Sequence, residues 1–313
     1  MSAFIRGITG SIATRVRVQT QSRATRQAKR TTKAMGGGDW AKEDTRRMLH
    51  AVYRVGPMDE YCKFMDACFG MKQLRYRDIP EEKYTNAFIG FGPETTNFCM
   101  ELTYNYGVDS YDIGTGFGHF GLAVTSVVDT CDKIKAAGYE ANITRPPGPV
   151  KGGKTQIAFV KDPAGFSWEL IERPGAEPKE PLAQVMLRVT DLDRSIEWYT
   201  NVLGCKLLRT RVNEQYNYTL AFLAFGEEED SCVFELTYNH GDHTYTPGDA
   251  YAQVAISTKD VYRSAEDIRA KGGNIVREPG PVPGIGTKIV SIRDPDGWKI
   301  VLVDEEDFLK ELE

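Results

Sequence analysis

Polar residues stand inside apolar stretches of this 313-residue sequence, and they recur at nearly constant spacing. The interval from His50 to His119 is nearly the same as the interval from Glu101 to Glu169, and each residue lies in an apolar segment typical of a strand. A buried carboxylate without a partner is strongly unfavourable. Two histidines and two glutamates are ligands for a hexacoordinate divalent cation that keeps two positions for water or substrate. The pattern therefore predicts a metal site; the alternative is buried histidines, with glutamates paired to arginines such as Arg54.

The spacing reflects an internal repeat that covers most of the chain. ELTYNYGVDSY from Glu101 recurs in the second half as ELTYNHGDHTY from Glu235, and DPAGFSWEL from Asp162 recurs at almost the same offset as DPDGWKIVL from Asp294. Each half repeats the order strand, helix and three strands. In the third unit, Asp191 is the expected N-cap of the helix and Gly204 its C-terminal stop.

These elements predict an α+β fold of four βαβββ modules, arranged as two tandem domains. The expected modules are 47–108, 116–174, 181–242 and 250–306. The expected domains are 47–174 and 181–306, with a Pro-rich linker at 175–180 and a C-terminal tail at 307–313.

In the second half the corresponding polar series is less complete. It comprises Gln184, Glu235, Gln253 and Val301, so the fourth module has no carboxylate at the position of Glu169. Each half contributes one C-terminal module, and only module two, the C-terminal module of the first half, keeps both polar residues. A working site must therefore contain His119 and Glu169.

Several long motifs resemble the glyoxalase I (lactoylglutathione lyase) family of the vicinal oxygen chelate superfamily. They are LHAVYRV, MELTYNYGVDSYDIGTGFGHFGLAV, GPVKGGKTQIAFVKDP and SWELIE. The tandem arrangement is similar to the two-domain plant and algal enzymes, so the resemblance implies two tandem glyoxalase-type domains. It covers nearly all of 47–312. The resemblance implies a metal-dependent lyase that isomerises the hemithioacetal of methylglyoxal and glutathione to S-lactoylglutathione, as part of methylglyoxal detoxification.

The same resemblance implies roles for particular residues. It places metal ligands at His50, Glu101, His119 and Glu169, with Glu169 as the catalytic base. It places glutathione-binding residues at Arg54, Asn105 and Lys151, the last in GPVKGG.

Two arrangements of the metal site remain open at this stage. If each half closes on itself, the first half carries the whole His-Glu-His-Glu set, which is similar to the nickel-type members. If modules pair across halves, Gln184 and Glu235 replace His50 and Glu101, and the set is similar to the zinc-type members. Module three also keeps an arginine and an asparagine at the glutathione positions, Arg188 and Asn239. Both arrangements predict one divalent ion (nickel or zinc, with cobalt as a further candidate), one functional site and one degenerate site.

Two other functions fit the same superfamily. One is a non-catalytic protein that binds a small metabolite, and the other is a ring-cleaving dioxygenase with Fe(II) on two histidines and one carboxylate. Four protein ligands leave little room for oxygen beside a bidentate substrate, which disfavours the dioxygenase.

Charge and composition indicate the cellular compartment of the protein and the kinds of partner that it can bind. The first 38 residues hold eight Lys/Arg and no Asp or Glu, typical of an organellar transit peptide, for chloroplast rather than mitochondrion. The alternative is a disordered basic tail on a cytosolic protein. The remaining residues carry 31 basic (39 − 8) and 44 acidic side chains, which disfavours nucleic acid as a partner. We expect no membrane span, reduced cysteines, and a monomer whose tandem halves resemble a dimer.

Overall fold

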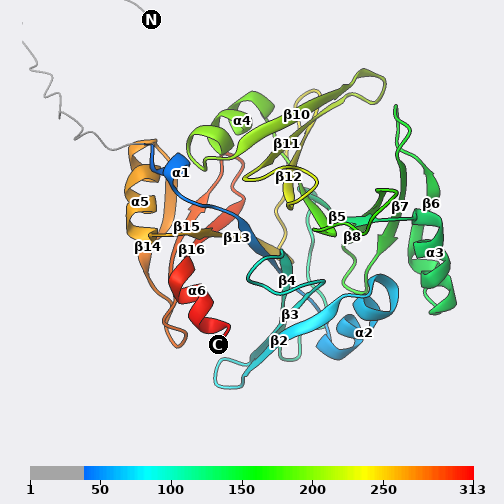
Figure 1. Cartoon of the computed structure of the whole chain (residues 1–313), viewed down its shortest axis with the longest axis horizontal. Helices are drawn as coiled ribbons and strands as arrows, with labels where there is room; N and C mark the ends of the chain where they lie inside the picture. The colour runs from blue at the N-terminus through cyan, green and yellow to red at the C-terminus, as the bar shows by residue number, and fades with distance from the viewer. Residues whose placement is uncertain (1–38) are drawn as a thin grey trace, which may run out of the picture. The chain divides into compact units, whose positions relative to one another are not determined.

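Residues 39–313 are the part of the chain that the structure, a computed structural model, describes, and they form four βαβββ modules (Figure 1). The transit peptide expected at 1–38 lies outside the described residues. The predicted α+β fold of four βαβββ modules is confirmed.

The modules have nearly equal strands and helices. The first comprises β1 (Met48–Arg54), α2 (Met58–Phe69), β2 (Lys72–Ile79), β3 (Tyr84–Gly90) and β4 (Cys99–Asn105). The second comprises β5 (Phe117–Val124), α3 (Val127–Ala136), η1 (Glu140–Asn142), β6 (Ile143–Pro149), β7 (Gln156–Lys161) and β8 (Ser167–Glu172). The third comprises β9 (Leu182–Arg188), α4 (Leu192–Asn201), β10 (Lys206–Asn213), η2 (Glu214–Tyr216), β11 (Tyr218–Ala224) and β12 (Val233–Asn239). The fourth comprises β13 (Tyr251–Thr258), α5 (Val261–Ala270), β14 (Asn274–Pro281), β15 (Lys288–Arg293) and β16 (Lys299–Asp304). A short helix α1 (Trp40–Glu43) precedes the modules and α6 (Glu305–Glu311) follows them.

Local sequence signals fix the helix ends. The Asp191 side chain accepts a hydrogen bond from the backbone N–H of Arg194 and caps α4, as its position in the sequence predicts. Gly204 follows with φ +76°, a conformation that a residue with a Cβ adopts at a cost.

The strands form two eight-stranded sheets, and each sheet joins two modules through their first strands. One has the order β14-β15-β16-β13-β1-β4-β3-β2, and the other β10-β11-β12-β9-β5-β8-β7-β6. β1 pairs antiparallel with β13, and β5 pairs antiparallel with β9. We call them the β1–β13 sheet and the β5–β9 sheet. Module one therefore shares a sheet with module four, and module two with module three.

Two crossover loops, 106–116 and 240–250, carry the chain from one sheet to the other and lie against each other. The Thr115 N–H donates to the Thr246 carbonyl (2.9 Å), and the Asp249 N–H donates to the Asp112 carbonyl (2.7 Å). Gly114 and Gly248 have φ of +71° and +65°, and an added Cβ would lie 2.3 Å from a carbonyl oxygen of the facing loop in each case. Only glycine fits both requirements, so these two residues allow the loops to pass this closely.

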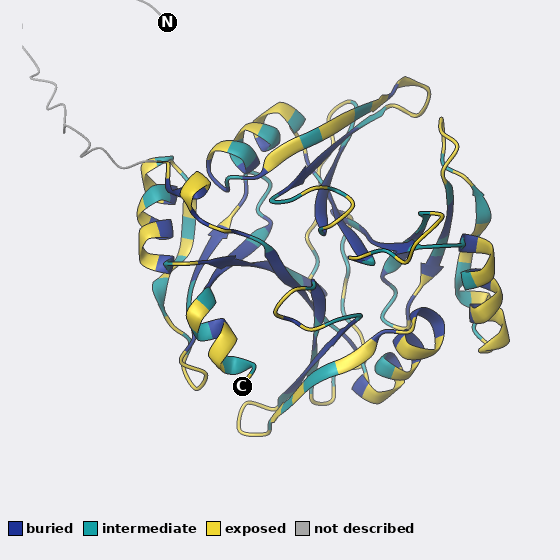
Figure 2. Cartoon of the chain, viewed as in Figure 1, coloured by how far each residue is buried: buried dark blue, intermediate teal, exposed yellow. Residues whose placement is uncertain are grey.

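Helices α2 to α5 pack on the sheets through one face and expose the other, while the central strands are buried (Figure 2). The six cysteines are free, and all but Cys62 are buried. Among residues 39–313, no helix combines the length and apolar character needed to cross a membrane.

Helix α6 packs against the β1–β13 sheet. Its Phe308 is 3% exposed and contacts an apolar cluster that includes Leu49, Ala255 and Val301. Residues 307–311, expected from the sequence to belong to a tail, are therefore part of a packed helix.

Candidate metal and substrate site

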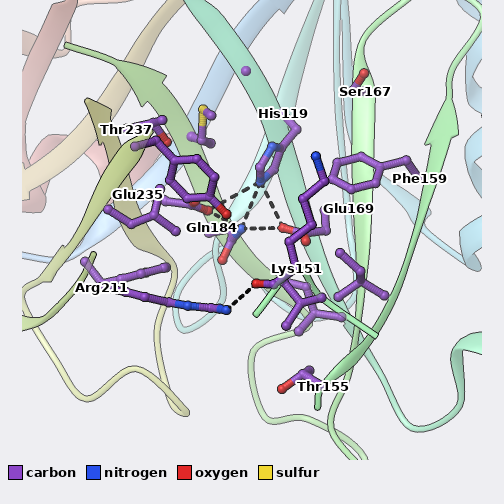
Figure 3. A pocket seen from close by; sticks show the side chains of 18 of the residues that line it. His119, Lys151, Thr155, Phe159, Ser167, Glu169, Gln184, Arg211, Glu235 and Thr237 are labelled. Carbon is purple, nitrogen blue, oxygen red and sulfur yellow. Dashed lines mark hydrogen bonds and ion pairs between the residues drawn. The ribbon is translucent and has the colours of Figure 1, made fainter. Parts of the chain in front are cut away.

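Four polar side chains converge on the β5–β9 sheet, one from each of its four central strands (Figure 3). They are His119 on β5, Glu169 on β8, Gln184 on β9 and Glu235 on β12. The register explains the convergence, because Gly121 on β5 lies opposite both Glu169 and Gln184. We call this cluster the His119 site.

The polar atoms of the His119 site are within hydrogen-bonding distance of one another. The His119 Nε2 lies 3.1 Å from the Glu169 Oε2 and 3.4 Å from the Glu235 Oε2. The Gln184 Nε2 lies 2.9 Å from the same histidine nitrogen and donates to Glu169 (3.1 Å) and Glu235 (2.5 Å). His119, Gln184 and Glu235 are buried, with 5–8% of each residue exposed.

The electrostatics favour a cation at this point. Burial by itself lowers the pKa of His119, but the carboxylates of Glu169 and Glu235 outweigh it and raise that pKa to about 10. A proton on His119 thus partly balances two carboxylates that lie close together. A divalent cation would displace that proton and balance both charges.

The donor set fits a divalent metal ion. Ligand atoms of His119, Glu169 and Glu235 lie within 4.8 Å of one another, close enough to share one ion. A half-turn of the Gln184 amide would present its oxygen to the same point, because the amide oxygen and nitrogen occupy equivalent places. Imidazole nitrogen with carboxylate and amide oxygens is a set that first-row transition metals accept.

The structure does not bring His50 and Glu101 to His119 and Glu169. The His50 Nε2 lies 3.1 Å from the Glu101 Oε2 on the β1–β13 sheet, because β1 pairs with β13 and β5 pairs with β9. The structure therefore does not support the expectation that all four ligands come from the first half. It brings together the alternative set, in which Gln184 and Glu235 replace His50 and Glu101.

A pocket of about 830 Å³ opens over the His119 site. Apolar side chains such as Met186, Phe159 and Phe222 line it, and the Phe159 ring meets the His119 ring edge to face at 5.6 Å. Cationic side chains from both modules also line it, namely Arg145, Lys151, Arg173, Arg188, Arg209 and Arg211. A pocket of this kind suits a small anionic molecule that also has apolar parts.

The residues expected to hold glutathione are divided between the two sheets. Lys151 lines the 830 Å³ pocket, whereas Arg54 and Asn105 line a separate pocket on the β1–β13 sheet. Their counterparts in the internal repeat, Arg188 and Asn239, line the pocket beside Lys151.

Comparison with known proteins identifies the family of the chain. The Glyoxalase/Bleomycin resistance protein/Dioxygenase superfamily model matches residues 47–170 and 182–302. The chain is 61% identical over 274 residues to "Probable lactoylglutathione lyase, chloroplastic" of Arabidopsis thaliana, covering 88% of this chain and 77% of the relative. It is 60% identical over 279 residues to the lactoylglutathione lyase of Oryza sativa, covering 88% and 95%. The crystal structure of glyoxalase I from Zea mays matches with a TM-score of 0.84 and 59% identity, covering 88% and 98%.

The chain belongs to the glyoxalase I family. The resemblance inferred from the motifs is thereby confirmed. Two tandem matches to one family model also agree with the internal repeat.

Sequence analysis missed Arg211, which shapes the mouth of the pocket. Its guanidinium donates to the Lys151 carbonyl (2.6 Å) and holds the loop between β6 and β7 against β10 (Figure 3). The Lys151 Nζ in turn lies 4.5 Å from the centroid of the Tyr216 ring. A single arginine on an edge strand is usually solvated, so its type and position alone did not mark it.

Gly121→Ala should weaken metal binding by about 10- to 100-fold, as loss of a supporting contact at a metal site typically does. A Cβ at Gly121 would lie 2.1 Å from the Cγ of Gln184, so the glutamine must leave its present position. Metal titration of the purified variant measures the effect. Gly280→Ala is the matched control, because nothing lies within 4 Å of its added Cβ. Equal metal affinity in Gly121→Ala and wild type would contradict a role for Gln184.

Proposed function

We propose that this chain converts the hemithioacetal of methylglyoxal and glutathione to S-lactoylglutathione at the His119 site, with the aid of one divalent metal ion. The observation that carries the proposal is the convergence of His119, Glu169, Gln184 and Glu235 at the base of a pocket lined by cations. The names of the relatives from Arabidopsis and rice support the same reaction.

The cations and amides of the pocket bind the glutathione part of the substrate. Arg188 donates to the carbonyls of Thr115 (3.0 Å) and Phe117 (2.7 Å), which hold its guanidinium in place. Asn239 is similarly oriented by the hydroxyl of Tyr245 (2.8 Å). Glutathione has two carboxylates, and a fixed guanidinium binds a carboxylate with a charge-assisted hydrogen bond.

His119, Glu169, Gln184 and Glu235 would hold the metal ion. When bound, a divalent cation stabilises negative charge that develops on the two oxygens of the substrate as its C–H bond breaks. The apolar walls around the cluster exclude water, which strengthens each of these electrostatic interactions.

Glu169 acts as the base. It takes the proton from C1 of the hemithioacetal and returns a proton to C2, while the hydroxyl proton moves from the C1 oxygen to the C2 oxygen, which leaves the thioester of lactate. Its side chain is 12% exposed against 6% for Glu235, so Glu169 is the more accessible of the two carboxylates. Glu235, which accepts the 2.5 Å hydrogen bond from Gln184, acts only as a ligand.

The counterpart on the β1–β13 sheet does not turn over substrate. Val301 stands at the position of Glu169, and the Asn86 Nδ2 donates to the Glu101 Oε1 (2.7 Å). The ring of Phe308 from α6 lies 6.4 Å from the His50 ring, centroid to centroid. One carboxylate is therefore absent, another is engaged, and apolar bulk lies beside the histidine.

Exhaustive chelation should reduce turnover to background, and re-adding a divalent cation should restore it. The reason is that Glu169 cannot remove a weakly acidic proton at a useful rate unless the resulting charge is stabilised. Elemental analysis should find about one ion per active chain. Re-addition of zinc, nickel and cobalt in turn tests the sequence-based expectation that zinc is preferred where Gln184 is a ligand. Full activity in protein shown to be metal-free would contradict the proposal.

We also propose that residues 1–38 direct import into the chloroplast. Their acid-free, Ser/Thr-rich composition supports this, as does the word "chloroplastic" in the name of the Arabidopsis relative. A fluorescent protein fused to residues 1–38 should enter chloroplasts, and a chain that begins at Asp39 should keep wild-type kinetics. A fusion that remains in the cytosol would count against import.

A further inference from the structure

The β1–β13 sheet carries its own pocket, of about 310 Å³, on β1, β3, β4 and β13. We call it the Arg54 pocket. Each of its lining residues has a counterpart, at the corresponding position of the internal repeat, among the residues that line the pocket of the His119 site. Half of these pairs are identical. They are Arg54 and Arg188, Tyr84 and Tyr218, Thr103 and Thr237, and Asn105 and Asn239.

The identical residues also keep the same contacts. Arg54 donates to the Asp249 carbonyl, the counterpart of the Thr115 carbonyl that Arg188 contacts. Asn105 donates to the hydroxyl of Tyr111 (2.7 Å), as Asn239 does to its tyrosine. The Arg54 pocket thus reproduces the end of the His119 site where we place glutathione.

The metal end of this second concavity is closed by α6. Besides placing Phe308 beside His50, the helix is fastened by Glu311, which accepts hydrogen bonds from Arg75 (3.3 Å) and Arg77 (3.1 Å) on β2. In Figure 1, α6 lies between β16 and β2 of the β1–β13 sheet. The lining of the Arg54 pocket accordingly includes neither His50 nor Glu101, and Val301 offers no carboxylate as a base.

Arg54 is the cation that lines the pocket, and its positive charge acts on Lys299 of the neighbouring module. Burial lowers the pKa of Lys299, and the positive charges of Arg293, Arg54 and Arg277 lower it further. Among residues 39–313, none of these four cations has a carboxylate within ion-pair distance. A group of mutually repelling cations without acidic partners is stabilised when an anion binds.

The pocket also offers a hydrogen-bond acceptor. Asn86 is 9% exposed and lines the pocket, and its Oδ1 is buried without a hydrogen-bond partner. A buried polar atom left without a partner is unfavourable, so an N–H donor from a ligand would satisfy it. The γ-glutamyl end of glutathione carries both a carboxylate and N–H donors.

We propose that the Arg54 pocket is a second, non-catalytic binding site for glutathione or a related small γ-glutamyl peptide. The choice of ligand rests on the function proposed for the His119 site, whereas the preference for an anion with N–H donors rests on the Arg54 pocket itself. The protein would then bind two molecules of the peptide per chain and turn over substrate at one of them.

The test is calorimetric titration of the metal-loaded full chain with S-methylglutathione, an unreactive thioether. Wild type should bind two equivalents. Arg54→Ala should lose one of them, with an affinity at that site at least about tenfold weaker, and keep wild-type kcat and KM. Arg188→Ala, the matched change at the His119 site, should lose the other equivalent and raise KM.

A second variant tests the same site if Arg54→Ala does not fold. Ala252→Phe fills the Arg54 pocket without removing any of its polar groups and should also leave one equivalent. Thermal melting shows that each variant is folded.

Each failure has a distinct signature. A single equivalent in wild type, lost in Arg188→Ala and unchanged in Arg54→Ala and Ala252→Phe, overturns the second site and leaves the proposed function intact. Absence of both binding and turnover in wild type overturns the proposed function, and the ligand assigned to the Arg54 pocket falls with it.

Discussion

Glu235→Ala should abolish turnover, and Glu101→Ala should leave it near the wild-type level. Glu235 lies 3.4 Å from His119 and 2.5 Å from Gln184, within the cluster that would hold the metal. Removing a carboxylate there deletes both a ligand and a negative charge, so we expect metal affinity and kcat/KM to fall together by at least about 100-fold. Steady-state kinetics and metal titration measure the two losses.

Glu101→Ala is the matched control, because Glu101 occupies the position in module one that Glu235 occupies in module three. Its carboxylate bonds His50 and Asn86 instead of residues of the His119 site. The change should lower the melting temperature, since His50 and Asn86 lose a partner, but not the rate. Loss of activity in Glu101→Ala with Glu235→Ala active would contradict the assembly of the site from modules two and three. Loss in both folded variants would mean that both concavities take part.

The sequence predicts that His119 and Glu169 of the second module lie in one cluster, and the structure places them together. His119 and Glu169 stand out because polar side chains in central, buried strands need partners, and the internal repeat shows that their positions are equivalent in each module. Register then brings them together, since a residue on β5 two positions from His119 pairs with Glu169.

The first-module partner could not be predicted, because modules one and three carry the same pattern. Both have Arg, Glu and Asn at matching positions. The sequence of a module's first strand does not determine which other module's first strand pairs with it. The pairing depends on contacts that are distant in sequence. The glycines at Gly114 and Gly248 are the sequence feature that bears on this pairing, because their positive φ and close approach allow the two crossover loops to pass each other.

One further difference between modules one and three was visible in the sequence. Asn86 stands where module three has Leu220, and it bonds Glu101, whereas Leu220 makes no such contact and lines the 830 Å³ pocket. The role of α6 was harder to foresee. Phe308 lies in a short, strongly charged terminal segment that resembles a solvated tail, and only its packing shows that it closes a concavity.

Glu169→Gln should lower kcat by about 10²- to 10⁴-fold, the usual contribution of a general base, with a much smaller change in KM. The amide keeps an oxygen near His119 and nearly the same shape, so substrate should still bind and metal should bind more weakly. What is lost is the ability to accept the C1 proton. Rates measured at saturating metal separate the loss of the base from the weakened metal binding. A wild-type kcat under those conditions would contradict the role of Glu169 as base.

The reciprocal change, Val301→Glu, should not create a second fast site. Val301 is 2% exposed and belongs to the apolar cluster that contains Phe308, so a carboxylate there loses its hydration without gaining a cation. We expect a less stable protein with wild-type kcat per chain.

The double variant Glu169→Gln, Val301→Glu decides between one and two competent sites, because all its activity must come from the β1–β13 sheet. It should be as inactive as Glu169→Gln alone, since Asn86 still bonds Glu101 and α6 still lies beside His50. Recovery of activity in the double variant would show that a missing carboxylate is the only defect of that concavity.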